Sequence, residues 1–206
     1  GLNPAYGEYG APRTVTVSAQ LPDGSPLSGT ATLSVAGADY DVTVNLRPVY
    51  PLAVRVPGFF KKTNPKFLRY VGLDARRVAE HQGIPFGAPR PDPIVQDLAT
   101  LDVAAQQPYI HRLTRLGAAA QIEGKSLHFT YAITKPIWDG SVSGWNEGDH
   151  LAKAAAAAGF DLAAMDAAIE ADPDRYEKVI AANEQDHERS GHWGVPTFVF
   201  ENEPFF

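Results

Sequence analysis

The order of strand-like and helix-like segments is the sequence feature that most limits how this chain can fold. Residues 14–21 and 41–46 are rich in β-branched side chains, and both are predicted to be strands. Helix-like segments then follow one another over residues 66–190, and a strand-like run returns only at residues 197–200. Sequential βαβ units would alternate instead. The order therefore predicts a small sheet with a helical domain inserted between its halves.

Start and stop signals define the predicted helices within this long tract. Residues 49–65 and 86–97 are rich in proline or glycine and are predicted loops. The predicted helices are residues 66–82 before Gly83, 98–120 with a division at Pro108, 127–138, 149–158 before Gly159, 162–171 after Asp161, and 173–190 before Gly191.

Residues 27–40, between the two predicted strands, allow two interpretations. The first is a helix between the two predicted strands. Gly29, Gly37 and the β-branched residues of this segment are poor helix formers and favour strands, as in a small β-sandwich. Both interpretations stay open on the sequence alone.

The composition excludes several classes of function. The chain has no cysteine, so it cannot itself carry out thiol–disulfide exchange, which requires a thiolate. With 18 Lys+Arg against 24 Asp+Glu the net charge is −6, and no basic tract suggests nucleic acid. We find no metal-ligand spacing and no apolar run of membrane-spanning length. Residues 1–12 are predicted to be a flexible arm without signal-peptide character, and the expected location is cytoplasmic.

A proline directly precedes the last strand-like run. Because proline donates no ladder hydrogen bond, Pro196 is expected at the beginning of a strand. Local energetics favour a trans Val195–Pro196 bond, although a fold can lock such a bond in cis. A cis bond would turn the backbone of Val195 outward and leave its N–H and C=O available to a peptide-like ligand.

Two stretches carry a family resemblance. Gly-Val-Pro-Thr-Phe-Val-Phe with Glu-Pro-Phe-Phe, in residues 194–206, and Arg-Pro-Val, residues 47–49, resemble the 2-hydroxychromene-2-carboxylate isomerases and kappa-class glutathione transferases. These enzymes have a DsbA-like thioredoxin fold. The resemblance implies an α/β fold with a thioredoxin-like mixed sheet and a large inserted all-helical domain. The two halves of the thioredoxin-like domain would be residues 13–57 and 191–206, and the insertion residues 58–190.

The resemblance also implies site residues and a ligand, glutathione. Pro196 would be cis, Val195 would pair with glutathione through its backbone, and Trp193 would line the site. Ser25, in Ser-Pro-Leu-Ser, would hold the glutathione thiolate at a helix N-terminus. Lys61 and Asn64 would bind the substrate. The structural alternatives are a turn serine, a packing tryptophan and a solvated lysine pair with Lys62.

The implied function is a glutathione-dependent isomerase that acts on an aromatic or polyketide-like carboxylic acid by reversible addition of the thiolate. A kappa-like glutathione transferase is one alternative, and a non-catalytic thioredoxin-fold binding module is another. The conformation of residues 27–38 separates these hypotheses, because the Ser25 site requires a helix there. The expected partners are glutathione and a small-molecule substrate, and a homodimer is possible.

Overall fold

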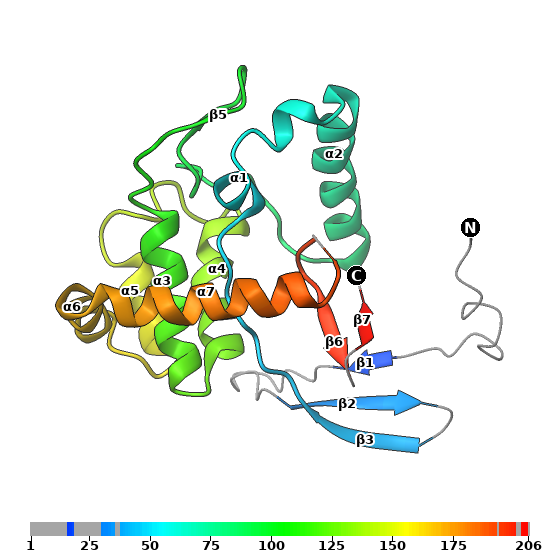
Figure 1. Ribbon diagram of the computed structural model, residues 1–206, viewed down its shortest axis with the longest axis vertical. Coiled ribbons are helices and arrows are strands. Elements are labelled where there is room, and N and C mark those ends of the chain that lie inside the picture. The colour runs from blue at the N-terminus through cyan, green and yellow to red at the C-terminus, as the bar shows by residue number, and fades with distance from the viewer. Residues whose placement is uncertain (1–15, 19–29, 36–37, 193, 201–202, 206) are drawn as a thin grey trace. The chain divides into compact units, whose positions relative to one another are not determined.

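The computed structural model describes residues 16–18, 30–35, 38–192, 194–200 and 203–205 (Figure 1). By its internal contacts the chain divides into two compact units, Gly1–Asn45 and Leu46–Phe206. The boundaries predicted from the sequence, with residues 13–57 and 191–206 in one domain, stay a prediction.

The first unit contains an antiparallel sheet of three strands in the order β1-β2-β3. These strands are β1 (Thr16–Ser18), β2 (Thr30–Val35) and β3 (Ala38–Thr43). Thr30 lies opposite Thr43 and Val35 opposite Ala38, so β2 and β3 pair along their whole length. The strand interpretation of this segment is therefore confirmed and the helix interpretation is wrong, in line with the weak helix propensity of glycine and β-branched residues.

Five helices build the core of the second unit: α3 (Ile110–Ile122), α4 (Ser126–Trp138), α5 (His150–Ala157), α6 (Leu162–Ala171) and α7 (Pro173–Arg189). The largest fully buried side chains are those of Trp145, Phe129, Leu116 and Ile180. In Figure 1 α7 is the long orange helix that crosses in front of α3 and α4. The two ends of α7 therefore lie in different parts of the unit.

Local signals explain most of the helix boundaries. Asp161 caps α6 by accepting a hydrogen bond from the N–H of Ala164 at 3.1 Å, and Gly159 and Gly191 have the positive φ values of 78° that follow a helix end. The predicted helix over residues 98–120 is only partly correct. The helix begins at Ile110, after Pro108, and residues 98–109 contain the short strand β5 (Asp102–Val103).

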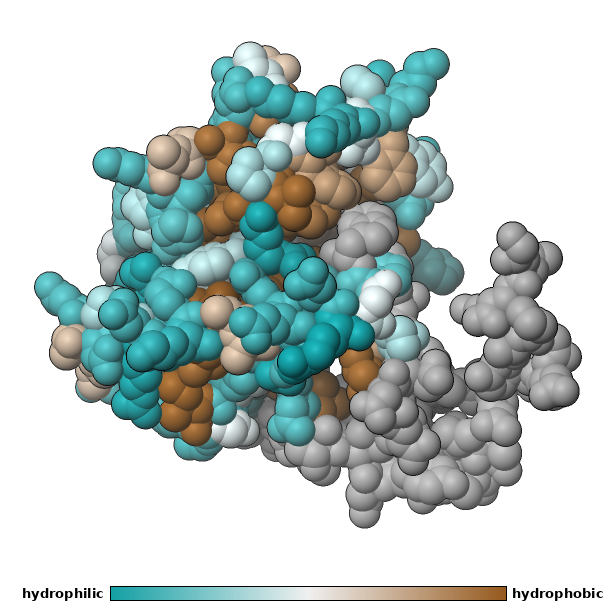
Figure 2. Space-filling model, in the orientation of Figure 1, coloured by the Kyte–Doolittle hydropathy of each residue, from teal (hydrophilic) through white to brown (hydrophobic). Residues whose placement is uncertain are grey.

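The loop predicted over residues 49–65 contains two short helices, α1 (Leu52–Arg55) and η2 (Phe60–Lys62), a single turn of 3-10 helix. The next helix, α2 (Pro65–Gln82), was predicted within one residue and ends at Gly83, whose φ is 66°. Only Ala79 of α2 is buried. Figure 2 shows apolar surface over the part of this unit where Figure 1 draws α1 and α2.

Two small two-stranded sheets complete the described part of the second unit. β4 (Gln96–Asp97) pairs with β5, and β6 (Phe198–Phe200) pairs with β7 (Glu203–Phe205), both antiparallel. The strand-like run after Pro196 is therefore one arm of a hairpin. This hairpin follows directly on the loop that connects it to α7.

Candidate functional site

The loop between α7 and β6 carries the residues that the sequence singled out most clearly. The Val195–Pro196 peptide bond is cis, as the resemblance implied. Val195 is exposed over 46% of its surface, and Pro196 is also exposed. Within the described part of the chain, neither the N–H nor the C=O of Val195 has a hydrogen-bond partner.

The residue before Val195 is fixed by three hydrogen bonds. The Gly194 carbonyl accepts from the Thr197 hydroxyl at 2.5 Å and lies 2.7 Å from Nε2 of His187. The Gly194 N–H donates to Nδ1 of His192 at 3.0 Å. Gly194 is buried while Val195 is exposed, so the loop is anchored at one residue and presents the next.

Arg55, the last residue of α1, indicates which ring nitrogen of His187 acts as the acceptor. Its Nη1 lies 3.3 Å from Nδ1 of His187. A guanidinium can only donate, so Nδ1 must accept, and the proton of the neutral ring is on Nε2. That N–H then donates to the Gly194 carbonyl. We call Arg55, His187, Gly194 and Thr197 the Arg55 relay.

The rest of the Arg55 guanidinium is not satisfied. Its Nε and Nη2 are buried, and neither has a hydrogen-bond partner in the described residues. The other buried side-chain atom without a partner there is Oδ1 of Asn146. An unpaired buried charged donor is costly, so such a group calls for an explanation.

Lys61 and Asn64 already have protein partners. Lys61 is in an ion pair with Asp102 of β5, and this hydrogen bond is the main cause that holds the pKa of the Asp102 carboxyl below its usual value. Asn64 is the N-cap of α2, with Oδ1 accepting from the N–H of Lys66 at 2.9 Å. Asparagine directly before a helix-starting proline is the signal that could have identified this cap. Their substrate-binding roles stay predictions.

Ser25 and Trp193 lie outside the described residues, so the roles expected for them stay untested. The segment that follows Ser25 bears on its role nevertheless. Thr30–Val35 is a strand, whereas a thiolate site at a helix N-terminus requires a helix after the serine.

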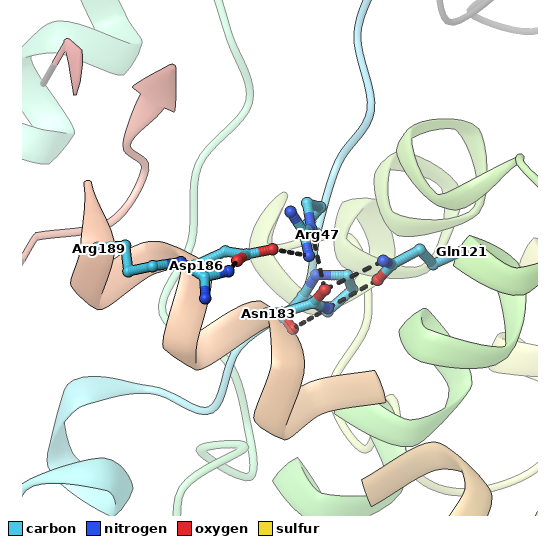
Figure 3. Close-up of polar contacts among 6 residues, drawn as sticks. Arg47, Gln121, Asn183, Asp186 and Arg189 are labelled. Atoms are coloured by element: carbon cyan, nitrogen blue, oxygen red, sulfur yellow. Dashed lines mark hydrogen bonds and ion pairs between the residues drawn. The ribbon is translucent and has the colours of Figure 1, made fainter. Parts of the chain in front are cut away.

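A second polar cluster fixes the start of the second unit. It consists of Arg47, Gln121, Asn183, Asp186 and Arg189, and we call it the α7 clamp (Figure 3). Asn183 is 2% exposed, and its Oδ1 accepts from Nε of Arg47 at 3.0 Å and Nε2 of Gln121 at 3.1 Å. Its Nδ2 donates to Oε1 of Gln121 at 2.7 Å and the Pro48 carbonyl at 2.8 Å.

Asp186 completes the α7 clamp by forming ion pairs with both Arg47 and Arg189, as Figure 3 shows. Asn183 uses its two donors and its two acceptor sites fully. The Arg-Pro-Val stretch quoted for the resemblance is therefore held by a satisfied network, which is typical of a structural role.

The sequence analysis missed Arg55 and His187 as members of the site. His187 lies one turn before Gly191, where a helix end close to the Pro196 motif could have suggested it. No local signal identifies Arg55, because its proximity to His187 arises only from the fold.

Comparison with protein families gives one result. The DSBA-like thioredoxin domain family matches residues 27–206. The chain belongs to this family. Its α/β fold class, thioredoxin-like with a helical insertion, is thereby confirmed, while the narrower resemblance to the isomerases and kappa-class transferases stays a proposal. The match begins after Ser25. A search of curated proteins gives no match.

Two further observations concern the described residues alone. None of their helices is long and apolar enough to cross a membrane. They contain no cluster of histidine, aspartate and glutamate side chains that could hold a metal ion.

Proposed function

We propose that this DsbA-like chain binds glutathione along the Val195–Pro196 loop and acts as a glutathione-dependent isomerase of an aromatic or polyketide-like carboxylic acid. Membership of the family supports the general class. The lack of any cysteine in the sequence supports a thiol that arrives with a ligand, because the chain offers none of its own.

The observation that carries the proposal is the contrast between Gly194 and Val195. Gly194 is buried and held by His187 and Thr197, whereas Val195 is exposed with its backbone N–H and C=O unpaired among the described residues. A backbone edge that is fixed in this way can pair with an extended peptide at a small loss of conformational entropy.

The donor groups near this loop fit glutathione, which is an anionic tripeptide. Val195 offers one backbone donor and one backbone acceptor for its peptide groups. Arg55 offers a permanent positive charge and two N–H-bearing nitrogens without partners among the described residues. These groups would hold the tripeptide, and its carboxylates are the natural match for a guanidinium.

When bound, glutathione would supply a thiolate that adds reversibly to a conjugated double bond of the substrate. The residues of the chain would orient the two molecules. Lys61 is the residue proposed for the substrate carboxylate, which would have to replace Asp102 as its partner. Ser25 is the hydroxyl proposed to stabilise the thiolate.

A non-catalytic glutathione-binding module is the second candidate. It is favoured by the extended conformation of Thr30–Val35, which leaves no helix immediately after Ser25 among the described residues. The two candidates share the Val195 site and differ in the need for Ser25.

Thermal unfolding with millimolar glutathione tests the shared part of both candidates. A ligand that binds only the native state raises Tm, by an amount that grows with the logarithm of its concentration. We expect a rise with glutathione. No change in Tm would contradict glutathione binding.

Turnover of 2-hydroxychromene-2-carboxylate with and without glutathione separates the two candidates. For the isomerase we expect glutathione-dependent turnover, which Ser25→Ala lowers on the order of 100-fold without lowering Tm. Glutathione binding without turnover would instead identify the binding module. Wild-type turnover in Ser25→Ala would exclude that serine from the reaction.

A further inference from the structure

Arg55 is the described arginine whose guanidinium has buried nitrogens without a hydrogen-bond partner among the described residues. Arg47 and Arg189 contact Asp186, Arg112 contacts Asp166, and Arg115 contacts Glu177. Arg55 has no carboxylate partner among the described residues and contacts a neutral ring nitrogen of His187 through Nη1. The described residues therefore leave its positive charge uncompensated, although two of its nitrogens are buried.

The unpaired edge of Arg55 has the geometry of a carboxylate receptor. Arg112 shows how that edge is used, because its Nε donates to Oδ1 of Asp166 at 2.8 Å and its Nη2 donates to Oδ2 at 2.6 Å. The same two nitrogens, Nε and Nη2, are the ones without partners in Arg55. Two parallel N–H groups of this kind match the two oxygens of a carboxylate.

The second half of α7, next to His187, carries three carboxylates, and none of them has a described contact with Arg55; Glu188 is exposed, and the other two have partners of their own. Glu184 accepts from the N–H of Tyr50 at 3.1 Å, and Asp186 forms ion pairs with Arg47 and Arg189. No carboxylate of the described residues pairs with Arg55. A bound molecule could supply one.

We propose that Nε and Nη2 of Arg55 receive a carboxylate of the ligand that binds at the Val195 loop. This inference rests on the proposed function and names the ligand class of that site, a carboxylic acid. The carboxylate belongs either to glutathione or to the acidic substrate. Through His187 the same guanidinium also fixes Gly194, so one side chain joins ligand binding to the conformation of the loop.

Burial of these nitrogens has a consequence for binding. A carboxylate that pairs with them must displace the groups that cover them, and the ion pair then forms away from water. Charge-assisted hydrogen bonds in such surroundings are stronger than exposed ones. Replacement of the ligand carboxylate by a neutral amide should therefore cause a large loss of affinity.

The first test is calorimetric titration of wild type, Arg55→Met and Arg55→Lys, with Arg112→Met as a matched control that removes a paired arginine. The probes are glutathione and two forms in which one or the other carboxylate is replaced by an amide. We expect wild type and Arg112→Met to bind glutathione at least about 10-fold more tightly than one of the amides. Arg55→Met should bind glutathione and both amides with similar affinity. Arg55→Lys should keep part of the preference for glutathione, because lysine keeps the positive charge without the two parallel N–H groups.

Benzoate and benzamide form the second arm and test the acidic substrate as the source, with the rise in Tm as readout. A rise in Tm with benzoate that is absent in Arg55→Met supports the carboxylate site, even if wild type does not bind glutathione. A failure to bind glutathione refutes only the proposed function. The inference is overturned if Arg55→Met prefers the carboxylate over the amide as strongly as wild type does, both for glutathione and for benzoate. It is also overturned if wild type prefers the carboxylate in neither case.

Discussion

Arg47 and Arg55 are eight positions apart, and both contact the second half of α7, yet their surroundings are opposite. In the α7 clamp Arg47 meets the buried amide of Asn183 and the carboxylate of Asp186. In the Arg55 relay the guanidinium has one neutral contact, and two of its nitrogens are buried without partners among the described residues.

The number of satisfied polar groups distinguishes a cluster that stabilises the fold from a cluster that could bind a ligand. A satisfied buried network stabilises one conformation of the chain, and removal of a member leaves its partners unpaired. A buried charged donor without an internal partner costs free energy, and a ligand that supplies the partner is one explanation for it. We therefore assign the α7 clamp to stability and propose binding as the role of the Arg55 relay.

The largest expected effect concerns the centre of the α7 clamp. Asn183→Leu removes four hydrogen bonds and leaves Gln121, Arg47 and the Pro48 carbonyl without their partner. We expect the free energy of unfolding to fall by about 3 kcal/mol in urea denaturation. Glutathione affinity at a temperature where the variant is folded should stay at the wild-type value. A loss below about 0.5 kcal/mol would show that the network does not stabilise the fold.

Removal of the histidine tests the Arg55 relay. His187→Phe deletes the donor to the Gly194 carbonyl, so we expect glutathione affinity to fall about 10-fold and stability by about 1 kcal/mol. His187→Gln keeps an N–H donor on a side chain of similar reach and should recover part of the affinity. Equal affinities for both variants and wild type would remove His187 from the site.

The sequence predicted the helix ends and the residues around the candidate site to different degrees. Helix ends at Gly83, Gly159 and Gly191 follow from local backbone preference and were predicted closely. Arg55 could not be predicted, because its contact with His187 spans 132 positions and depends on how α1 meets α7. Val195 and Pro196 were found through a short motif in which a proline precedes a strand.

Lys61 and Asn64 illustrate a different limit of the sequence. A motif can locate a residue without showing what its side chain already contacts. The side-chain oxygen Oδ1 of Asn64 accepts from the N–H of Lys66, and Lys61 is in an ion pair with Asp102. Roles carried over from a family pattern therefore require the contacts as well as the positions.

Asn64→Ala provides a smaller effect that separates capping from substrate binding. Loss of the N-cap of α2 should lower the free energy of unfolding by about 1 kcal/mol. Asn64→Asp keeps the cap and removes the amide, so it should keep stability and lower substrate affinity if the proposed role is correct. Unchanged stability in Asn64→Ala would contradict the capping role.

A further prediction concerns alkaline pH and Tyr50, whose hydroxyl donates to Oε1 of Glu177 at 2.7 Å. Burial and this carboxylate raise the pKa of Tyr50 above its ordinary value of 10.0. The folded state then binds the proton more tightly than the unfolded state. The resulting stability is fully present below about pH 10 and is lost as the pH rises further. Denaturation at pH 9 and 11 should show this fall in wild type and a smaller one in Tyr50→Phe.

The most direct test compares the two arginines by urea denaturation of Arg47→Met and Arg55→Met at pH 7. Methionine keeps an unbranched apolar side chain and removes the charge in both cases. We expect Arg47→Met to lower the free energy of unfolding by about 2 kcal/mol, since Asn183 and Asp186 lose a partner. Arg55→Met should leave it unchanged or raise it, since a buried unpaired charge disappears. A loss in Arg55→Met as large as that in Arg47→Met would contradict the assignment of Arg55 to ligand binding.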